Sequence, residues 1–286
     1  MTTTAAAPAS VDTGLAEARC AGIDRLDAAL LLGDVLKRPR TWLLAHGEAP
    51  LEADQGTRYR GLLARRAAGE PLAYLLGRKE FHGLDLHIDA RVLVPRPETE
   101  LLVDWAGELL GDAAIRTQPP RVVDLGTGSG AIALALKQAH PCARVLATDA
   151  SASALEVAAA NSRRLGIDIE LRRGDWWNAV PGAIFDLAVS NPPYIVGDDA
   201  HLAALRHEPI EALSPGADGL AALRILIAGA ASHLHEGAWL LLEHGYDQGS
   251  DVRALFSQHG FEPAITRADL AGRDRCTGAR ASARSP

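Results

Sequence analysis

The chain is 286 residues long, and its 48% hydrophobic and 23% charged residues are ordinary values for a globular protein. This composition excludes a disordered, collagen-like or disulfide-dense chain, and the three cysteines stand far apart without a C-x-x-C pair. The net charge of −7 argues against nucleic acid as the main partner, because nucleic-acid-binding proteins usually carry excess positive charge. No signal-peptide pattern and no apolar run of membrane-spanning length are visible, so we expect a cytoplasmic protein with no membrane partner.

A helical pattern fills the first quarter of the chain, from about residue 15 to residue 77. Leu26, Leu30 and Leu31 recur at the spacing of one helix face, and Asp24 is placed to cap that helix. A later helix is expected to open at Asp54. These segments predict a small helical domain over residues 1–80, which holds 11 basic and 10 acidic residues against 18 and 26 in the remainder.

Several arginines follow Asp54 along the later helix of this domain. They leave two interpretations open, because such a row either binds an acidic protein or rRNA surface or simply faces solvent. The residues concerned are Arg58, Arg60, Arg65 and Arg66.

The hydrophobic period changes after residue 80. Residues 81–94 read FHGLDLHIDARVLV, which alternates as two strands do and predicts a β-hairpin turning at Asp89-Ala90-Arg91. We therefore expect a hairpin linker over residues 81–95. Pro95 and Pro97 then precede a predicted helix over 98–110.

Strand and helix patterns alternate from residue 121 onward. This alternation predicts an α/β domain over residues 96–286, with a seven-stranded, mostly parallel, Rossmann-like sheet covered on both faces. The last two strands have no room for a helix between them and should be antiparallel. The predicted strands are 122–125, 144–148, 169–172, 185–190, 239–243, 264–267 and 276–281, and the predicted helices are 130–139, 151–165, 219–233 and 248–258.

A glycine-rich turn joins the first strand of this domain to its first helix. Residues 121–131 read RVVDLGTGSGA, so Gly126, Gly128 and Gly130 alternate with Thr127 and Ser129. The G-x-G-x-G spacing differs from the G-x-G-x-x-G of dinucleotide sites. Such a turn lets the backbone approach a ligand closely, although it can also be an ordinary tight turn without one.

An acidic side chain stands two residues before the first glycine of the turn. Asp124 would attract a cationic group, such as the amino group of an amino acid, and would repel a pyrophosphate. The pattern therefore favours S-adenosylmethionine over a nicotinamide dinucleotide.

The next two strands also end in residues suited to a nucleoside. Asp149 ends the second strand, where a carboxylate can accept both ribose hydroxyls, although it could instead cap the following helix. Asp175 and Trp176 follow the third strand and offer an acceptor and a flat ring for adenine, unless Trp176 and Trp177 are core aromatics. Because ligands bind at the carboxyl ends of such strands, the three strand ends predict one site.

The fourth strand leads into Asn191-Pro192-Pro193-Tyr194. The two prolines cannot continue a strand ladder, so they predict a stiff loop in which the Asn191 amide and the Pro192 carbonyl are free to act as acceptors. Two acceptors of this kind suit both hydrogens of a planar NH2 group, with the Tyr194 ring close by. A turn without chemistry is the alternative.

Together these motifs resemble a known family. DLGTGSGAIAL, TDAS, GDWW and SNPPYI, with PRPETE before them and LLLEHGYDQG after them, are similar to the peptide chain release factor N5-glutamine methyltransferases (PrmC/HemK type). These are class I S-adenosylmethionine-dependent enzymes. The resemblance covers about residues 15 to 280, while the Asn-Pro-Pro-Tyr motif alone also occurs in adenine and guanine N-methyltransferases.

The resemblance implies a role for each site residue. Residues 126–130 would hold the methionine part of the donor, beside the carboxylate of Asp124 that its charge already assigns to the donor's cationic group. Asp149 would hold the ribose, and Asp175 with Trp176 the adenine. Residues 191–194 would bind the substrate glutamine, with Asn191, Pro192 and Tyr194 as catalytic residues and Asn191 also near the donor. Arg96 and Glu98 of PRPETE lie near the site without an assigned role.

The resemblance also implies the partners. The substrate would be the glutamine of the Gly-Gly-Gln loop in class I release factors, with S-adenosylhomocysteine as product, and the helical domain would dock the release factor. We expect a monomer without a metal, since the histidines show no metal-ligand spacing.

Other functions remain as alternatives to this one. An adenine-N6 or guanine-N2 nucleic-acid methyltransferase shares the Asn-Pro-Pro-Tyr motif, but the acidity of the catalytic part disfavours it. A donor-binding module without activity would lack one of the site residues, and none is missing. A nicotinamide oxidoreductase is disfavoured by the glycine spacing and by Asp124.

Overall fold

The computed structural model describes residues 9–111, 119–216 and 218–282. The chain divides into two compact units, Met1–Arg78 and Lys79–Pro286. Within the described residues, no helix is both long enough and apolar enough to cross a membrane.

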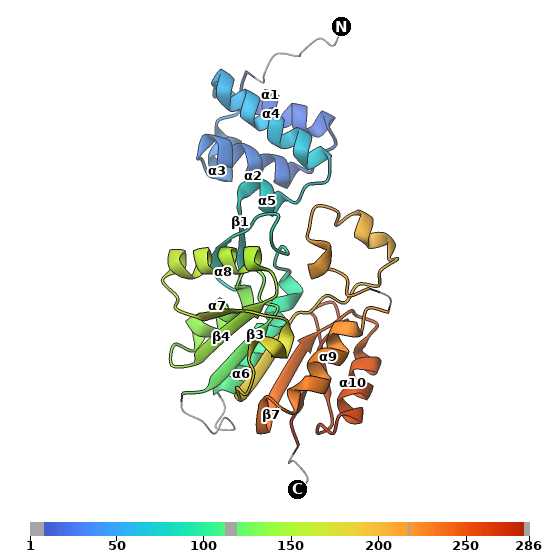
Figure 1. Cartoon of the computed structure of the whole chain (residues 1–286). Helices are drawn as coiled ribbons and strands as arrows, with labels where there is room; N and C mark the ends of the chain where they lie inside the picture. The colour runs from blue at the N-terminus through green and yellow to red at the C-terminus, as the bar shows by residue number, and fades with distance from the viewer. Residues whose placement is uncertain (1–8, 112–118, 217, 283–286) are drawn as a thin grey trace. The chain divides into compact units, whose positions relative to one another are not determined.

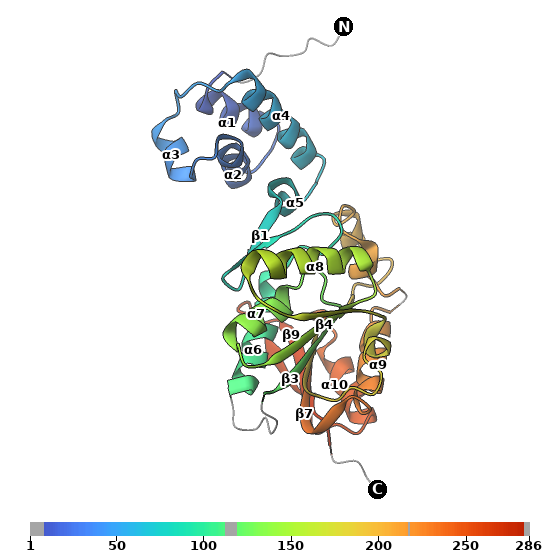
Figure 2. The ribbon, with the colours of Figure 1, turned by 60° about the vertical axis from the view of Figure 1, so that its left-hand side comes forward.

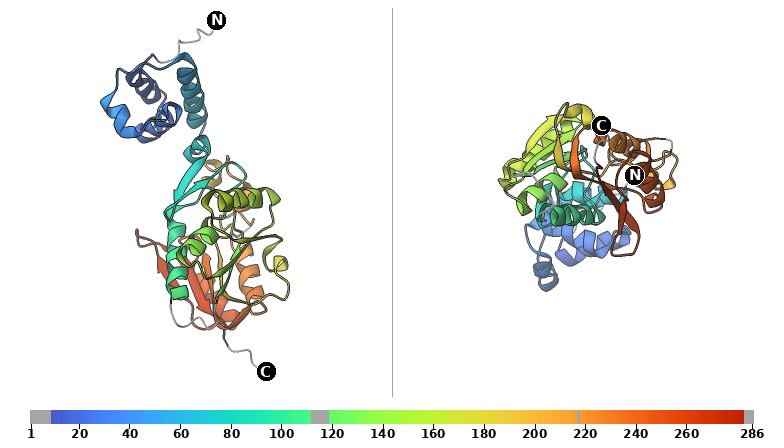
Figure 3. Two further views of the ribbon diagram at one scale, coloured as in Figure 1. Left: turned by 90° about the vertical axis from the view of Figure 1, so that its left-hand side faces the viewer. Right: turned by 90° about the horizontal axis from the view of Figure 1, so that it is seen from below.

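Helices make up the described part of the first unit (Figure 1, and the blue helices in Figure 3). The core of the unit gathers fully buried side chains such as Leu31, Leu32 and Tyr59, and the Tyr59 hydroxyl donates to the Ala28 carbonyl oxygen at 3.1 Å. The predicted cap is confirmed, because the Asp24 carboxylate accepts from the Leu26 amide at 2.7 Å. The helices are α1 (Val11–Cys20), α2 (Arg25–Leu36), α3 (Arg40–Ala45), α4 (Ala53–Ala67) and α5 (Leu72–Leu76).

The arginines of α4 all have acidic partners inside the first unit. Most of these ion pairs are partly exposed, and exposed pairs contribute at most about 1 kcal/mol each. The row is thus largely neutralised by its own unit, which favours the interpretation as a solvated helix face. The pairs are Arg58 with Asp34, Arg60 with Glu17, Arg65 with Glu70, and Arg66 with Asp27.

The hairpin at the start of the second unit turns earlier than the sequence predicts. Strands β1 (Arg78–Phe81) and β2 (Leu84–His87) are joined by His82-Gly83, with φ values of 48° and 78°. Positive φ at both central residues is what a two-residue hairpin of right-handed twist requires. The prediction of a hairpin turn at Asp89-Ala90-Arg91 is therefore wrong, because the hairpin turns at His82-Gly83.

Residues 88–96 run without a strand although they alternate in hydrophobicity. The Asp89 carboxylate accepts from the Arg91 amide at 3.0 Å, which is a local turn of the kind that aspartate favours. Val92 and Val94 are buried, yet the Val94 amide donates to the Glu208 carboxylate at 3.0 Å instead of to a neighbouring strand. Buried and exposed residues alternate here as they do in a strand, although the segment makes no strand-to-strand hydrogen bonds. This explains why the sequence pattern predicted a strand.

A seven-stranded sheet forms the centre of the second unit, which confirms the predicted α/β fold (Figure 1). The order is β5-β4-β3-β6-β7-β9-β8, with β3 to β7 parallel and β9 antiparallel to both β7 and β8, as predicted for the final pair. The strands are β3 (Arg121–Leu125), β4 (Arg144–Asp149), β5 (Glu170–Arg173), β6 (Phe185–Ser190), β7 (Leu234–Glu243), β8 (Ile265–Ala268) and β9 (Asp274–Arg280).

Helices cover both faces of this sheet. Figure 2 shows α6 and α7 on one side and α9 and α10 on the other. Every residue of β6 is buried, as expected for a central strand covered on both faces. The helices are α6 (Glu100–Gly111), α7 (Ala131–Ala139), α8 (Ala152–Leu165), α9 (Ala221–Ala230) and α10 (Gly249–Gln258), and the short 3-10 segments are Pro97–Thr99, Trp176–Ala179, Ala200–Ala203 and Ile210–Ala212.

The direction of the chain across the sheet reverses beside β3. The chain passes from β3 outward to β4 and β5, and then returns to place β6 on the other side of β3. In open α/β sheets the carboxyl ends of the strands at such a reversal flank a ligand crevice. The predicted site residues follow β3, β4, β5 and β6 at this edge.

Candidate active site

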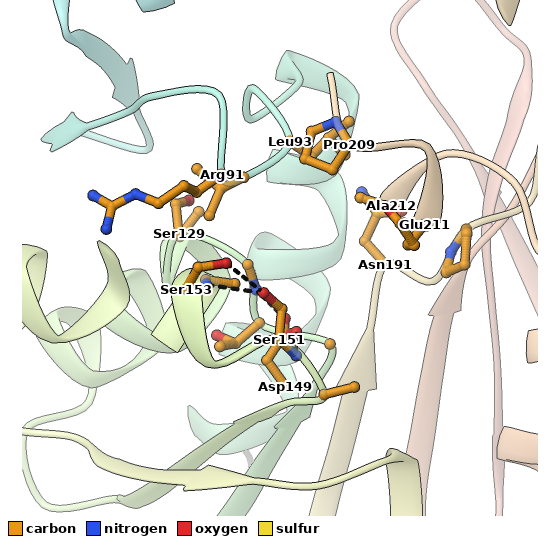
Figure 4. A pocket seen from close by; sticks show the side chains of 18 of the residues that line it. Arg91, Leu93, Ser129, Asp149, Ser151, Ser153, Asn191, Pro209, Glu211 and Ala212 are labelled. Atoms are coloured by element: carbon orange, nitrogen blue, oxygen red, sulfur yellow. Dashed lines mark hydrogen bonds between the residues drawn. The ribbon is translucent and has the colours of Figure 1, made fainter. Parts of the chain in front are cut away.

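A pocket of about 720 Å³ lies at this edge of the sheet. Figure 4 shows Asp149 and Ser151 on one side of it and Asn191 on the other. Of the predicted site residues, those that line the pocket are Gly126, Thr127, Gly128, Ser129, Asp149, Asp175, Trp176, Asn191 and Pro193, while Asp124, Gly130, Pro192 and Tyr194 are not part of its lining.

The glycine turn takes a conformation that other residues rarely adopt. Gly126 has a φ of 77°, and a Cβ added to it would lie 3.1 Å from the ring of Trp176. At Gly130, with a φ of 84°, a Cβ would lie 3.2 Å from the Cβ of Ala158 on α8. The first glycine thus lets the backbone approach the Trp176 ring, and the third lets two helices pack closely.

Asp149 ties the glycine turn to the end of the next strand. Its Oδ2 atom accepts from the Gly128 amide at 2.9 Å, and Oδ1 accepts from the Ser151 amide at 2.8 Å. Ser151, rather than Asp149, is the N-cap of α8. Burial raises the pKa of Asp149. Each carboxylate oxygen can accept a further hydrogen bond, so the side chain remains able to bind two hydroxyls in the pocket.

The two tryptophans after β5 have different environments. Trp176 lines the pocket, and its ring packs on Gly126. The backbone of Trp176 has a φ of 46°, a conformation that is rare and costly for an aromatic residue and is typical of functional sites. Trp177 instead joins the core, where its Nε1 donates to the Leu226 carbonyl oxygen at 2.8 Å and its ring stacks on His233. The core interpretation thus applies to Trp177, while Trp176 remains available to a ligand.

Asp124 lies beneath the glycine turn instead of in the pocket wall. The side chain is fully buried, and its Oδ2 atom accepts from the Thr127 hydroxyl at 2.6 Å. Its Oδ1 atom has no hydrogen-bond partner among the residues described. Burial raises the pKa of this carboxyl to about 7. The carboxyl thus supports the turn through Thr127, and direct contact with a cationic ligand group stays a prediction.

We expect the substitution Asp124→Asn to stabilise the second unit more at pH 8 than at pH 4.5. With its pKa raised to about 7 from 3.8, the folded carboxyl keeps a proton that the unfolded chain has already released. The wild type therefore loses stability as the pH rises from about 4 to about 7, whereas asparagine has no proton to lose. Urea unfolding should show the variant's advantage growing by about 2–4 kcal/mol between the two pH values. An advantage of equal size at both would contradict the raised pKa.

The acceptor turn, residues 191–194, is fixed by side chains from distant segments. The Asn191 Nδ2 atom donates to Thr99 Oγ1 at 3.1 Å, and Gln248 Nε2 donates to the Tyr194 carbonyl oxygen at 3.1 Å. The Tyr194 hydroxyl donates to Glu243 Oε1 at 3.1 Å. In this structure Tyr194 therefore lies behind the turn and supports it, and a ring stacked on the substrate stays a prediction.

Two further residues that the sequence analysis did not single out support the pocket from outside. Asn161 of α8 is fully buried, and it accepts from the His87 amide while donating to the carbonyl oxygens of His87 and Ser129. Glu208 accepts from the Val94 amide and pairs with Arg96 at 2.6 Å. For Asn161 the sequence held one signal, a polar residue on the apolar face of α8. For Glu208 it held none.

The PRPETE segment takes its place through these contacts. Arg96 pairs with Glu208, whose neighbour in the chain, Pro209, lines the pocket. Thr99 accepts from the side-chain amide of Asn191. The motif that the sequence left without a role therefore braces the acceptor side of the pocket.

Comparisons with known proteins show the family of the chain. Residues 14–77 match the family model for the PrmC N-terminal domain, and residues 100–218 match the methyltransferase small domain. The release factor glutamine methyltransferase of Xylella fastidiosa (strain Temecula1) is 50% identical over 258 residues, which cover 89% of this chain and 92% of that protein. The chain belongs to the release factor glutamine methyltransferase family. The family predicted from the motifs is thereby confirmed.

Further members of the release factor glutamine methyltransferase family are similarly close. The protein from Bordetella pertussis (strain Tohama I) is 49% identical over 260 residues, covering 90% of this chain and 95% of its own. Among solved structures, a methyltransferase from Pyrococcus furiosus has a TM-score of 0.52 at 18% identity, over 77% of this chain and 98% of that chain. This likeness shows a shared fold alone.

Proposed function

We propose that the chain transfers a methyl group from S-adenosylmethionine to the side-chain amide nitrogen (N5) of the glutamine in the Gly-Gly-Gln loop of peptide chain release factors, and so modulates translation termination. The observation that carries the proposal is Asn191, which lines the pocket while Thr99 holds its amino group. The names of the relatives supply the substrate class.

The residues of the pocket fit the proposed donor. The carboxylate of Asp149 keeps lone pairs that can accept from the ribose hydroxyls. Asp175 and Trp176 line the pocket after the neighbouring strand β5, where adenine would lie. The volume of about 720 Å³ suits a ligand of this size. When bound, S-adenosylmethionine supplies a methyl group activated by positively charged sulfur, leaving S-adenosylhomocysteine as product.

The acceptor turn fits a primary amide. Because Asn191 Nδ2 donates to Thr99, the amide oxygen of Asn191 is the atom left to accept a substrate N–H. The Pro192 carbonyl is the second proposed acceptor, and no hydrogen bond to it occurs within the described ranges. An amide nitrogen is a poor nucleophile, since its lone pair is delocalised. Holding both N–H groups would orient that lone pair, and the methylated nitrogen then releases its extra proton without a strong base.

The domains divide these tasks in the proposal. We assign residues 1–80 to docking the release factor, 81–95 to linking, and 96–286 to methyl transfer. A match to the PrmC N-terminal domain supports the first assignment. A three-residue loop offers little contact area, whereas stable complexes bury about 1,200–2,000 Å², so a second contact surface is needed. We expect a monomer that acts in the cytoplasm, where release factors meet ribosomes.

Mass spectrometry of a purified release factor tests the proposal. Incubation with the chain and S-adenosylmethionine should add one methyl group, mapped to the loop glutamine by peptide sequencing. A release factor whose loop glutamine is changed to alanine should gain none. Methylation of DNA or rRNA with the release factor untouched would replace this function with the nucleic-acid alternative.

A further inference from the structure

A buried carboxyl lies behind the acceptor turn, and the proposed reaction does not use it. Glu243 ends β7 and is 1% exposed. Its Oε1 atom accepts from the Tyr194 hydroxyl, and its Oε2 atom has no hydrogen-bond partner in the described part of the chain. Burying a carboxyl while one of its oxygen atoms has no hydrogen-bond partner is costly, so the position calls for a physical reason.

The surroundings of Glu243 come from several segments. The hydroxyls of Thr99 and Tyr194 and the positive charge of Arg275 favour its ionised form, while Glu98 disfavours it. Arg275 is already paired with Asp269 at 3.0 Å, and so neutralises the carboxyl only partly. Cys276 pairs with Glu243 in the strand register and is buried there. With burial as the largest influence, the pKa of Glu243 rises to about 7.

Thr99 is a neighbour of this carboxyl, and it contacts the acceptor residue directly. Its hydroxyl accepts from Asn191 Nδ2 at 3.1 Å, and the same hydroxyl is among the neighbours that stabilise the charge of Glu243. One hydroxyl can donate to a carboxylate and accept from an amide at the same time. In that arrangement Thr99 holds the NH2 group of Asn191 away from the substrate, and the amide oxygen of Asn191 points toward the substrate.

We propose that Glu243 is a positioning residue for methyl transfer. It holds one end of the acceptor turn through the observed bond from Tyr194, and in the proposal it also accepts from the hydroxyl of Thr99, which holds Asn191 at the other end. The inference rests on the proposed function, because it assigns the turn to the substrate amide. A carboxylate can accept from both hydroxyls. A glutamine side chain offers one oxygen and one NH2 group, so it would accept from one hydroxyl and donate to the other. The substitution therefore keeps the shape and changes the direction of the hydrogen bonds.

Glu243→Gln tests the link with two measurements. We expect kcat for methyl transfer to fall about tenfold, the scale of one misdirected hydrogen bond, with the donor Kd unchanged. In the wild type kcat should rise with pH through neutrality as Glu243 ionises, and this rise should flatten in the variant. Thr99→Val should lower kcat similarly. The double variant should lose less than the two losses combined, because both substitutions break the proposed link from Glu243 through Thr99 to Asn191.

A second readout needs no substrate. The side-chain amide NMR signals of Asn191, assigned from their loss in Asn191→Asp, should shift with pH near neutrality in the wild type and not in Glu243→Gln. This keeps the inference separate from the proposed function, since the shift is expected whichever acceptor is methylated.

Asp186→Asn is the matched control. Asp186 is also a buried carboxyl of the sheet, it accepts from the Arg121 amide at 2.8 Å, and it does not line the pocket. We expect this control to leave both kcat and the Asn191 signals as in the wild type. The positioning role would be overturned if the Asn191 signals shifted with pH equally in the wild type and in Glu243→Gln. It would also be overturned if Asp186→Asn lowered kcat as much as Glu243→Gln does.

Discussion

Replacing Asn191 with alanine is expected to lower kcat by about 100- to 1,000-fold, the effect of losing one positioned hydrogen-bond partner in the reactive arrangement. The oxygen of this amide is the proposed acceptor for a substrate N–H, and Thr99 keeps it in place from 92 residues away in the sequence. Single-turnover methylation of a release factor, with saturating donor, measures the effect on the chemical step.

Donor affinity and unfolding distinguish this effect from a damaged fold. Asn191 is half-buried and makes one side-chain hydrogen bond in the structure, so calorimetric binding of S-adenosylhomocysteine and the melting temperature should change little. Ser214→Ala is a control, since Ser214 lies outside the pocket and its hydroxyl accepts from the nearby Gly216 amide. An Asn191→Ala protein with wild-type kcat would place the acceptor group elsewhere.

Replacing Asp149 with alanine is expected to weaken donor binding by about 1.5–3 kcal/mol, the range for hydrogen bonds to a charged group. This corresponds to a rise in Kd of about 10- to 150-fold. The loss has two sources in the structure, because the carboxylate both faces the pocket and accepts from the amides of Gly128 and Ser151. Titration calorimetry with S-adenosylhomocysteine measures it.

A matched carboxylate separates the Asp149 site from general charge effects. Glu170 lies on the neighbouring strand β5, is exposed, pairs with Arg172 and does not line the pocket. Glu170→Gln should therefore bind the donor product as the wild type does. Similar Kd values for Asp149→Ala, Glu170→Gln and the wild type would exclude Asp149 from the donor site.

The sequence predicted the strand ends of the pocket because their signals are local. Gly126, Asp149 and Asn191 each end or follow a short apolar strand, and Trp176 follows a short polar one. The carboxyl ends of such parallel strands must meet at one edge of the sheet. The same local reasoning failed at the hairpin. The hydrophobic alternation of residues 88–94 buries Ile88, Val92 and Val94, whereas the left-handed conformations at His82 and Gly83 decide where the chain turns.

The residues that the sequence missed, Thr99, Glu208 and Glu243, each contact a residue that it named, across a long separation in the chain. Thr99 and Asn191 are 92 residues apart, Arg96 and Glu208 are 112 apart, and Tyr194 and Glu243 are 49 apart. No spacing rule connects such pairs, since neither partner lies within a helix turn or a strand neighbour of the other.

By itself, then, the sequence determined the α/β fold and the four strand ends from which the pocket is made, because periodicity and turn chemistry act over a few residues. The family followed from the resemblance of its motifs. Only the tertiary structure decided that Asp124 supports the turn from below, that Trp176 faces the pocket while Trp177 enters the core, and that Glu243 lies behind the acceptor turn. These outcomes depend on which side chains share a buried volume, where each polar group must find a partner that the folded chain alone brings within reach.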